Sequence, residues 1–288
     1  MTPLPVKACC TVKPVESDYE PVGALVQIDD YSAYVVGPEE AKKAIIVLYD
    51  IFGFHANTKQ FCDALARERD YKVVMPDFFM GDYFSQDHVP SGHGFLVNSI
   101  NWVRLISYII GHATFSKTEP CLDKTYAWLK NQGHDTVGLV GFCWGGKRSI
   151  EYAAKHDFVV GAALIHPSMM TLGDFKMAKS PLLLIPTKDE PDLVSNSERR
   201  RLCHADLSSI QTPHFELLKT KPFFDKCKHV RYQGKLLRLL SHPFHSFFLD
   251  INHGFASARG DWTDEHVRSR VNDAIQETVT FFDGLFDV

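Results

Sequence analysis

A cysteine enclosed by glycines is the residue in this chain whose setting best suits covalent chemistry. At 141–146 the sequence reads Gly-Phe-Cys-Trp-Gly-Gly, with Cys143 at the centre of a Gly-x-Cys-x-Gly motif. An apolar, β-branched run at 136–140 precedes the motif and a run with helical spacing at 147–155 follows it. This order predicts a strand, a sharp turn that exposes a nucleophile, and a helix, which together form a nucleophile elbow.

The two glycines beside the cysteine have a physical role in such a turn. The elbow holds its central residue in a strained backbone conformation, and we expect side chains at Gly141 and Gly145 to collide with the neighbouring strand and helix. The alternative interpretation is a buried, unreactive Cys143 in an ordinary strand-to-helix connection.

The partners of a nucleophile on an elbow follow it in the sequence, first an acid and then a histidine. A buried strand at 181–185 runs into a loop with three carboxylates, of which Asp189 is the preferred acid, Asp192 a competitor and Glu190 a lesser one. Among the 14 histidines, only His253 has the right order and setting, in a loop before the last predicted helix.

These residue types form a complete set for acyl transfer. A thiol is mostly protonated at neutral pH, so Cys143 needs an imidazole to take its proton, and His253 needs an anion such as Asp189 to hold its ring. The developing oxyanion needs backbone donors, which we expect from the N–H groups of Trp144 and Ile51.

The elements that must position these residues alternate between strand and helix. The hydrophobic pattern predicts strands at 24–28, 32–36, 44–49, 72–75, 136–140, 159–165 and 181–185. It predicts helices at 57–69, 100–110, 121–131, 147–155 and 265–282, and an irregular loop at 78–94 that could line a pocket. We therefore expect an α/β-hydrolase fold, with a mostly parallel central sheet covered by helices on both faces.

The chain is predicted to form one domain after a short lead-in. Prolines make residues 1–20 an irregular N-terminal segment, and residues 21–288 form the single α/β-hydrolase domain. Residues 195–211 and 233–247 break the strand–helix rhythm, so we interpret them as insertions without well-packed, hydrogen-bonded backbone.

Composition restricts the class of protein. The chain has 288 residues, 45% hydrophobic and 23% charged, with a net charge of −4, which gives no electrostatic reason to expect nucleic acid or a membrane as a partner. The N-terminus lacks a signal-peptide core, and seven cysteines form no regular framework. We therefore expect a cytoplasmic protein with reduced thiols.

Four motifs together resemble the dienelactone hydrolase family, also called carboxymethylenebutenolidases. The elbow at 141–146 is accompanied by Asp-Ile-Phe-Gly at 50–53, Met-Pro-Asp-Phe-Phe at 75–79 and His-Gly-Phe-Ala at 253–256, in the family's order. The resemblance implies a single α/β-hydrolase domain, no metal and no organic cofactor. It also implies a triad of Cys143, His253 and Asp189.

The resemblance suggests further site residues. Asp50 stands where bacterial members carry a glutamate that activates the thiol, so its role is either thiol activation or support of the oxyanion loop. Ser257 replaces a substrate-binding arginine of the family, and Arg259 is a candidate substitute. His166 ends a predicted strand at the same sheet edge as Cys143, as a pocket residue or a structural one.

The function that follows is hydrolysis of a small carboxylic ester, lactone or thioester through an acyl-cysteine intermediate. The departures at 50 and 257 weaken the case for a dienelactone substrate more than the case for ester hydrolysis. One alternative is a disabled hydrolase fold kept for small-molecule binding or scaffolding. Another is a redox-sensing thiol, although no resolving cysteine lies near in the sequence.

Overall fold

The computed structural model describes residues 13–91, 94–190, 217–229 and 250–286. The insertions expected at 195–211 and 233–247 lie outside these residues. Residues 13–22 form no helix or strand, but the Val15 N–H donates to the Ala258 carbonyl at 3.0 Å. The described part of the lead-in therefore contacts the body of the protein.

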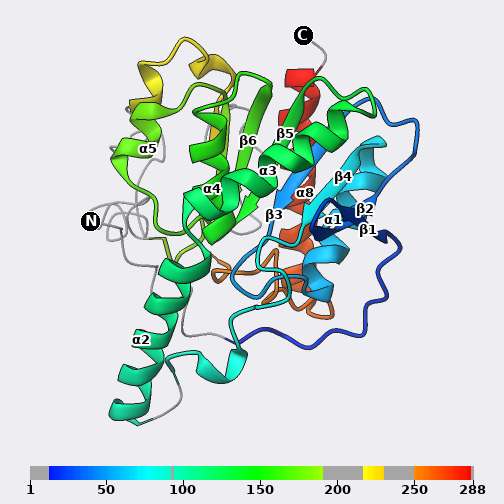
Figure 1. Cartoon of the computed structure of the whole chain (residues 1–288). Helices are drawn as coiled ribbons and strands as arrows, with labels where there is room; N and C mark the ends of the chain where they lie inside the picture. The colour runs from blue at the N-terminus through cyan, green and yellow to red at the C-terminus, as the bar shows by residue number, and fades with distance from the viewer. Residues whose placement is uncertain (1–12, 92–93, 191–216, 230–249, 287–288) are drawn as a thin grey trace.

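A single twisted sheet forms the centre of the molecule (Figure 1). Within the described residues it has eight strands in the order β1-β2-β4-β3-β5-β6-β7-β8. The strands are β1 Ala24–Ile28, β2 Tyr31–Val36, β3 Ala44–Leu48, β4 Lys72–Pro76, β5 Val137–Phe142, β6 Val159–Ile165, β7 Leu182–Ile185 and β8 Lys228–His229. The β1–β2 and β2–β4 pairs are antiparallel and the others are parallel, which confirms the mostly parallel sheet.

Helices cover both faces of this sheet, as the strand–helix alternation predicts. They are α1 Ala56–Arg69, α2 Phe95–His112, α3 Phe115–Lys130, α4 Trp144–Ala153, α5 Leu172–Met177 and α8 Glu265–Phe286, with short 3₁₀ turns at Gln86–His88 and Phe224–Lys226. Figure 1 shows α3 and α4 in front of the sheet and α8 behind it. Among the described helices, none has the length and apolarity that crossing a bilayer requires.

The alternation of side chains along β3 divides the interior into two cores. Ile45 and Val47 pack with α1 and α8, whereas Ile46 and Leu48 pack with α3 and α4. All five residues of β3 are buried and all five are apolar. A continuously apolar strand is typical of a parallel sheet covered on both sides.

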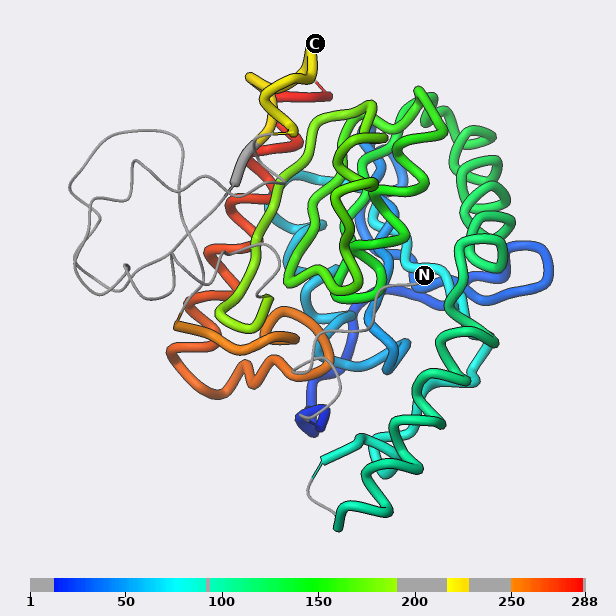
Figure 2. The backbone as a smooth tube through the Cα atoms, turned by 90° about the vertical axis from the view of Figure 1, so that its left-hand side faces the viewer, coloured from blue at the N-terminus to red at the C-terminus, as the bar shows by residue number. Residues whose placement is uncertain are grey.

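Helix α2 is longer than its sequence pattern indicated and differs in position from the other helices. It begins at Phe95 rather than near residue 100, and it extends away from the body of the protein in both views (Figures 1 and 2). Its last turn is the end that joins the body, next to the start of α3.

The carboxyl ends of the parallel strands lie at one edge of the sheet and position the candidate residues. Asp50 follows β3, Cys143 follows β5, His166 follows β6, and Glu190 lies in the loop that follows β7. Parallel strands bring their carboxyl ends together, and ligands of open α/β sheets bind at that edge.

Candidate active site

Cys143 has the backbone conformation of a nucleophile elbow. Its φ is +52° and its ψ is −113°, a region that non-glycine residues rarely occupy, directly between β5 and the first residue of α4. A Cβ on Gly141 would come within 2.4 Å of the Gly145 carbonyl oxygen, and a Cβ on Gly145 within 2.2 Å of the Leu48 carbonyl oxygen. Both expected collisions are confirmed, because in each case the obstructing atom is backbone.

The backbone around the elbow is fixed by the neighbouring strand. The Cys143 N–H donates to the Ile165 carbonyl at 3.2 Å, and the Ser168 N–H donates to the Cys143 carbonyl at 3.0 Å. Cys143 is itself fully buried, so the expectation that the turn exposes its side chain is wrong for solvent exposure in this structure. The strained turn is therefore held on both sides by backbone hydrogen bonds, which is the setting in which such strain persists.

The imidazole of His253 contacts a different carboxylate from the preferred one. Its Nδ1 lies 2.5 Å from Oε1 of Glu190, and both side chains are buried. Asp189 instead accepts the backbone N–H of His253 at 2.9 Å. The expectation that Asp189 holds the ring is thus corrected in favour of Glu190, and Asp192 lies outside the described residues.

The loop after β7 explains why the glutamate reaches the ring. The other carboxylate oxygen of Glu190 accepts the backbone N–H of Thr187, and the Asp189 N–H donates to the Thr187 hydroxyl at 3.3 Å. This tight turn directs Glu190 into the interior, whereas Asp189 is only half-buried and faces the main chain of the histidine loop.

Asp50 joins the two loops that flank the site. Its Oδ1 accepts the Phe52 N–H at 2.9 Å, and its Oδ2 accepts the Ser257 hydroxyl at 2.6 Å and the Ala258 N–H at 3.3 Å. The side chain is fully buried. These contacts connect the loop of Ile51 with the loop of His253, which is what the supporting role of Asp50 requires.

Arg259 is part of the loop of His253, contacts the loop of Ile51, and is not a surface residue. It is 7% exposed, and its guanidinium carbon is 4.8 Å from the centre of the Phe52 ring. A Cβ on Gly254 would meet the Arg259 side chain at 2.9 Å, so Gly254, with φ of +87°, leaves room for it. The guanidinium therefore contacts Phe52, the residue that follows the predicted oxyanion donor Ile51 in the chain.

His166 packs directly on the histidine of the site. It is fully buried, has a φ of +38°, and its ring centre lies 4.8 Å from that of His253 in an edge-to-face arrangement. Its N–H donates to the Ile185 carbonyl at 2.8 Å, which fixes the backbone between β6 and β7. This position makes His166 a direct neighbour of the His253 ring.

A family comparison identifies the scaffold that carries this geometry. The model of the dienelactone hydrolase family matches residues 31–214, which is more than half of the chain. The chain belongs to the dienelactone hydrolase family. Members of this family hydrolyse carboxylic esters and lactones, so the protein is a carboxylic ester hydrolase.

Individual relatives agree with this assignment. Hydrolase pyvD of Aspergillus violaceofuscus is 27% identical over 286 residues, which cover 98% of each chain. The human carboxymethylenebutenolidase homolog is 27% identical over 230 residues, which cover 79% of this chain and 81% of the human protein. The crystal structure of dienelactone hydrolase from Anabaena variabilis matches 93% of this chain and 99% of its own, with a TM-score of 0.53 and 10% identity, and shows the same fold.

In this dienelactone hydrolase family member, Trp144 connects the elbow to helix α2. Its indole N–H donates to the Ala113 carbonyl at 2.7 Å, directly after the last turn of α2. Its ring centre lies 4.8 Å from that of Phe79 and 5.9 Å from that of Phe78. The sequence predicts Trp144 as a backbone donor but contains no signal for the contact of its indole with Ala113.

Tyr49 extends this aromatic wall and anchors the loop after β4. Its hydroxyl donates to Asp77 at 2.9 Å and accepts the Phe79 N–H at 2.8 Å, while the Tyr83 hydroxyl donates to the other Asp77 oxygen at 2.9 Å. Burial raises the pKa of Tyr49 well above its usual value, and the Asp77 carboxylate acts in the same direction. Both tyrosines therefore stay protonated as donors that fix the loop of Phe79.

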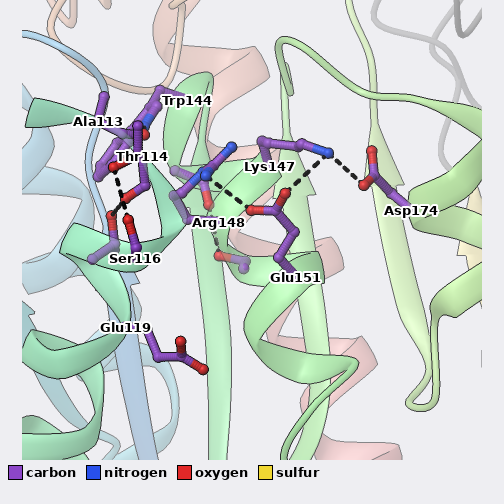
Figure 3. Close-up of polar contacts among 12 residues, drawn as sticks. Ala113, Thr114, Ser116, Glu119, Trp144, Lys147, Arg148, Glu151 and Asp174 are labelled. Carbon is purple, nitrogen blue, oxygen red and sulfur yellow. Dashed lines mark hydrogen bonds and ion pairs between the residues drawn. The ribbon is translucent and has the colours of Figure 1, made fainter. Parts of the chain in front are cut away.

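Two cations that follow the elbow are buried in an ion-pair network that the sequence pattern did not reveal (Figure 3). Lys147 contacts Asp174 and lies 3.1 Å from Glu151, and Arg148 lies 3.0 Å from the other oxygen of Glu151. Burial lowers the pKa of Arg148, and the carboxylates of Glu151 and Asp174 oppose that shift. Because Asp174 lies on α5, the network holds α4 against the segment that follows His166.

The described residues contain no group of three or more His, Cys, Asp or Glu side chains that could hold a metal ion.

Proposed function

We propose that the protein hydrolyses a small carboxylic ester or lactone through an acyl-cysteine intermediate, with Cys143 as nucleophile, His253 as general base and Glu190 as the orienting acid. The observation that carries this proposal is the buried 2.5 Å contact between Nδ1 of His253 and Glu190. A carboxylate at Nδ1 leaves Nε2 as the basic nitrogen of the ring.

The steps balance without any further reactant than water. Nε2 of His253 accepts the Cys143 proton, and the sulfur bonds to the substrate carbonyl carbon. The tetrahedral intermediate collapses with cleavage of the carbon–oxygen bond, and the imidazolium gives its proton to the leaving alkoxide. Water, deprotonated by the same nitrogen, then attacks the thioester carbonyl. The carbon–sulfur bond breaks, the carboxylic acid leaves, and the imidazolium returns its proton to the Cys143 thiolate.

The oxyanion is stabilised in this proposal by the N–H groups of Trp144 and Ile51. Trp144 is the first residue of α4, so its amide lies at the positive end of a helix dipole. The loop of Ile51 is held by the Asp50 contacts to Phe52 and to the histidine loop. Fixed donors of this kind need no reorganisation when charge develops.

Arg259 and His166 complete the proposed pocket. The Arg259 guanidinium beside Phe52 supports a preference for substrates with a carboxylate near the scissile bond. The ring of His166 against His253 supports a positioning role for this residue rather than direct contact with the substrate.

The test of the proposed function is covalent trapping. Purified protein mixed with an activated ester and quenched in acid should gain the mass of one acyl group, and peptide mapping should place that group on Cys143. A panel of simple esters, lactones and thioesters, each with and without a carboxylate, then ranks the substrates. Product formation without any adduct on Cys143 would reject the cysteine mechanism, and tight binding without turnover would support the disabled-hydrolase alternative.

The role of Asp50 gives a separate prediction. Asp50→Asn places an amide donor among backbone N–H groups and the Ser257 hydroxyl, so we expect kcat to fall about 10- to 100-fold through displacement of the Ile51 loop. The rate of Cys143 alkylation by iodoacetamide should stay near that of the unchanged protein.

Ser257→Ala is the matched control for this substitution. It removes one of the three contacts to Asp50 and should lower kcat by less than about 10-fold. A large loss of alkylation rate in Asp50→Asn at unchanged melting temperature would instead assign thiol activation to Asp50.

The expected cytoplasmic location is part of the proposal. Cys62, Cys121 and Cys227 form no disulfide within the described residues, which supports a reducing compartment.

A further inference from the structure

Helix α2 presents an apolar face to solvent that the enzymatic function does not use. Seven of its side chains are large, apolar and exposed, with exposures from 36% to 84%: Phe95, Leu96, Val97, Ile100, Val103, Ile106 and Ile110. The helix extends away from the body of the protein in both views (Figures 1 and 2). Single exposed apolar residues are ordinary, but a contiguous set on one element is typical of an interaction surface.

The other face of the same helix already packs on the protein. Asn101, Leu105 and Ile109 are buried, and the ring of Tyr108 lies 5.4 Å from that of Phe79 and 5.4 Å from that of Phe84. Helix α2 is therefore apolar on two opposite sides, which is typical of a helix buried between two partners. One partner is the body of this chain.

The exposed side chains follow the spacing of a helix–helix seam. Leu96, Ile100, Val103, Ile106 and Ile110 are separated by four, three, three and four residues, a mean of 3.5 residues per turn. We call these five residues the α2 stripe. A stripe with this period keeps facing a second helix along its whole length.

We propose that a second copy of this chain occupies the α2 stripe, with the two α2 helices antiparallel about a two-fold axis at Val103. In that arrangement Leu96 packs against Ile110 of the partner and Ile100 packs against Ile106. The stripe is self-complementary because it contains no charged residue that would face its own kind. In this antiparallel pair, the Phe95 end of each helix lies beside the His112 end of its partner. The remainders of the two chains therefore lie at opposite ends of the helix pair.

The exposed area of the α2 stripe reaches the lower limit for such an interface. Its five side chains, at roughly 100 Å² each, offer about 500 Å² per copy, or about 1,000 Å² in total, which is about the least that a specific interface buries. Helices that lie on membranes carry several Lys or Arg residues at the edge of their apolar face. Helix α2 has only Arg104, in a chain with a net charge of −4, so a protein partner fits better than a lipid surface.

The first experiment measures mass in solution. Sedimentation velocity of the full chain at micromolar concentration should give a dimer, and Ile100→Lys with Val103→Lys should raise the dissociation constant about 100-fold or more. The control variant, Asn131→Lys with Gln132→Lys, adds the same two charges at the exposed end of α3 and should remain dimeric. A monomeric parent protein, or a stripe variant as dimeric as the control, would overturn the proposal.

A second experiment keeps the proposal testable if the lysine variant fails to fold. Val103→Cys should form an intermolecular disulfide under mild oxidation, because the axis places this position opposite itself. Leu96→Cys should not, because its counterpart in the antiparallel pair is position 110. Cross-linking at 96 but not at 103 would contradict the arrangement, as would a monomer that sediments with phosphatidylcholine or phosphatidylserine vesicles.

Discussion

Cys143→Ala lowers kcat/KM for an activated ester by at least about 10⁴-fold in the mechanism proposed here. The substitution removes the atom that forms the acyl bond, and the remaining oxyanion donors and binding contacts account only for residual catalysis. The backbone of the elbow is unchanged in this variant, since alanine also carries a Cβ. We therefore expect its melting temperature to stay close to that of the parent, measured by circular dichroism beside the steady-state rates.

The chain offers a matched cysteine as control. Cys62 on α1 is also fully buried, and burial raises the pKa of its thiol, with the nearby Asp63 carboxylate acting in the same direction. Such a thiol is inert, so Cys62→Ala should retain the parent kcat and should still form the acyl adduct. If Cys143→Ala and Cys62→Ala turn over at the same rate, the nucleophile is not Cys143.

Glu190→Gln should have the second largest effect, a fall in kcat of about 10³- to 10⁴-fold. The glutamine amide can donate to Nδ1 of His253, which favours the wrong ring tautomer, and it no longer stabilises the imidazolium by charge. The geometry changes little because the substitution is isosteric. Rates across a pH series, together with melting temperatures, separate this loss from a loss of folded protein.

Asp189→Asn is the matched variant, because it tests the neighbouring carboxylate in the same loop. Asp189 accepts only the His253 backbone N–H in the described contacts of its side chain, and an asparagine oxygen can accept that bond equally. We expect kcat of Asp189→Asn to fall by less than about 10-fold. If Asp189→Asn is the damaging substitution and Glu190→Gln is mild, the acid is Asp189 and the loop after β7 rearranges during the reaction.

The comparison of these two carboxylates shows where the sequence stops being informative. Both follow the same strand, and both have the chemistry that an imidazole needs. Their assignment depends on the turn at Thr187, which fixes one Glu190 oxygen, and on the approach of a loop more than sixty residues later in the chain. Propensity and periodicity describe residues that are neighbours along the chain. They therefore do not predict which of two adjacent carboxylates contacts a histidine from a distant loop.

Asp50 and helix α2 are two further features that the sequence did not predict, each for a different reason. The sequence left Asp50 between two roles, and the contacts to Phe52 and Ser257 became visible only when the loops after β3 and before α8 were brought together. The apolar pattern of α2 indicated a helix but not its exposure, because a buried helix and a helix with a free apolar face have the same composition.

The sequence by itself determined most of the strands and helices and the order of the motifs, but not α5, β8 or the starts of α2 and α3. Continuous β-branched runs gave the parallel strands, and the spacing of Gly141, Cys143 and Gly145 gave the elbow, because both patterns are dictated by local backbone sterics. Tertiary structure alone decided that Glu190 meets the ring of His253 and that Asp50 joins two loops. Those contacts join residues that are distant in the chain, and their geometry is set by how the sheet, its loops and the two cores pack together.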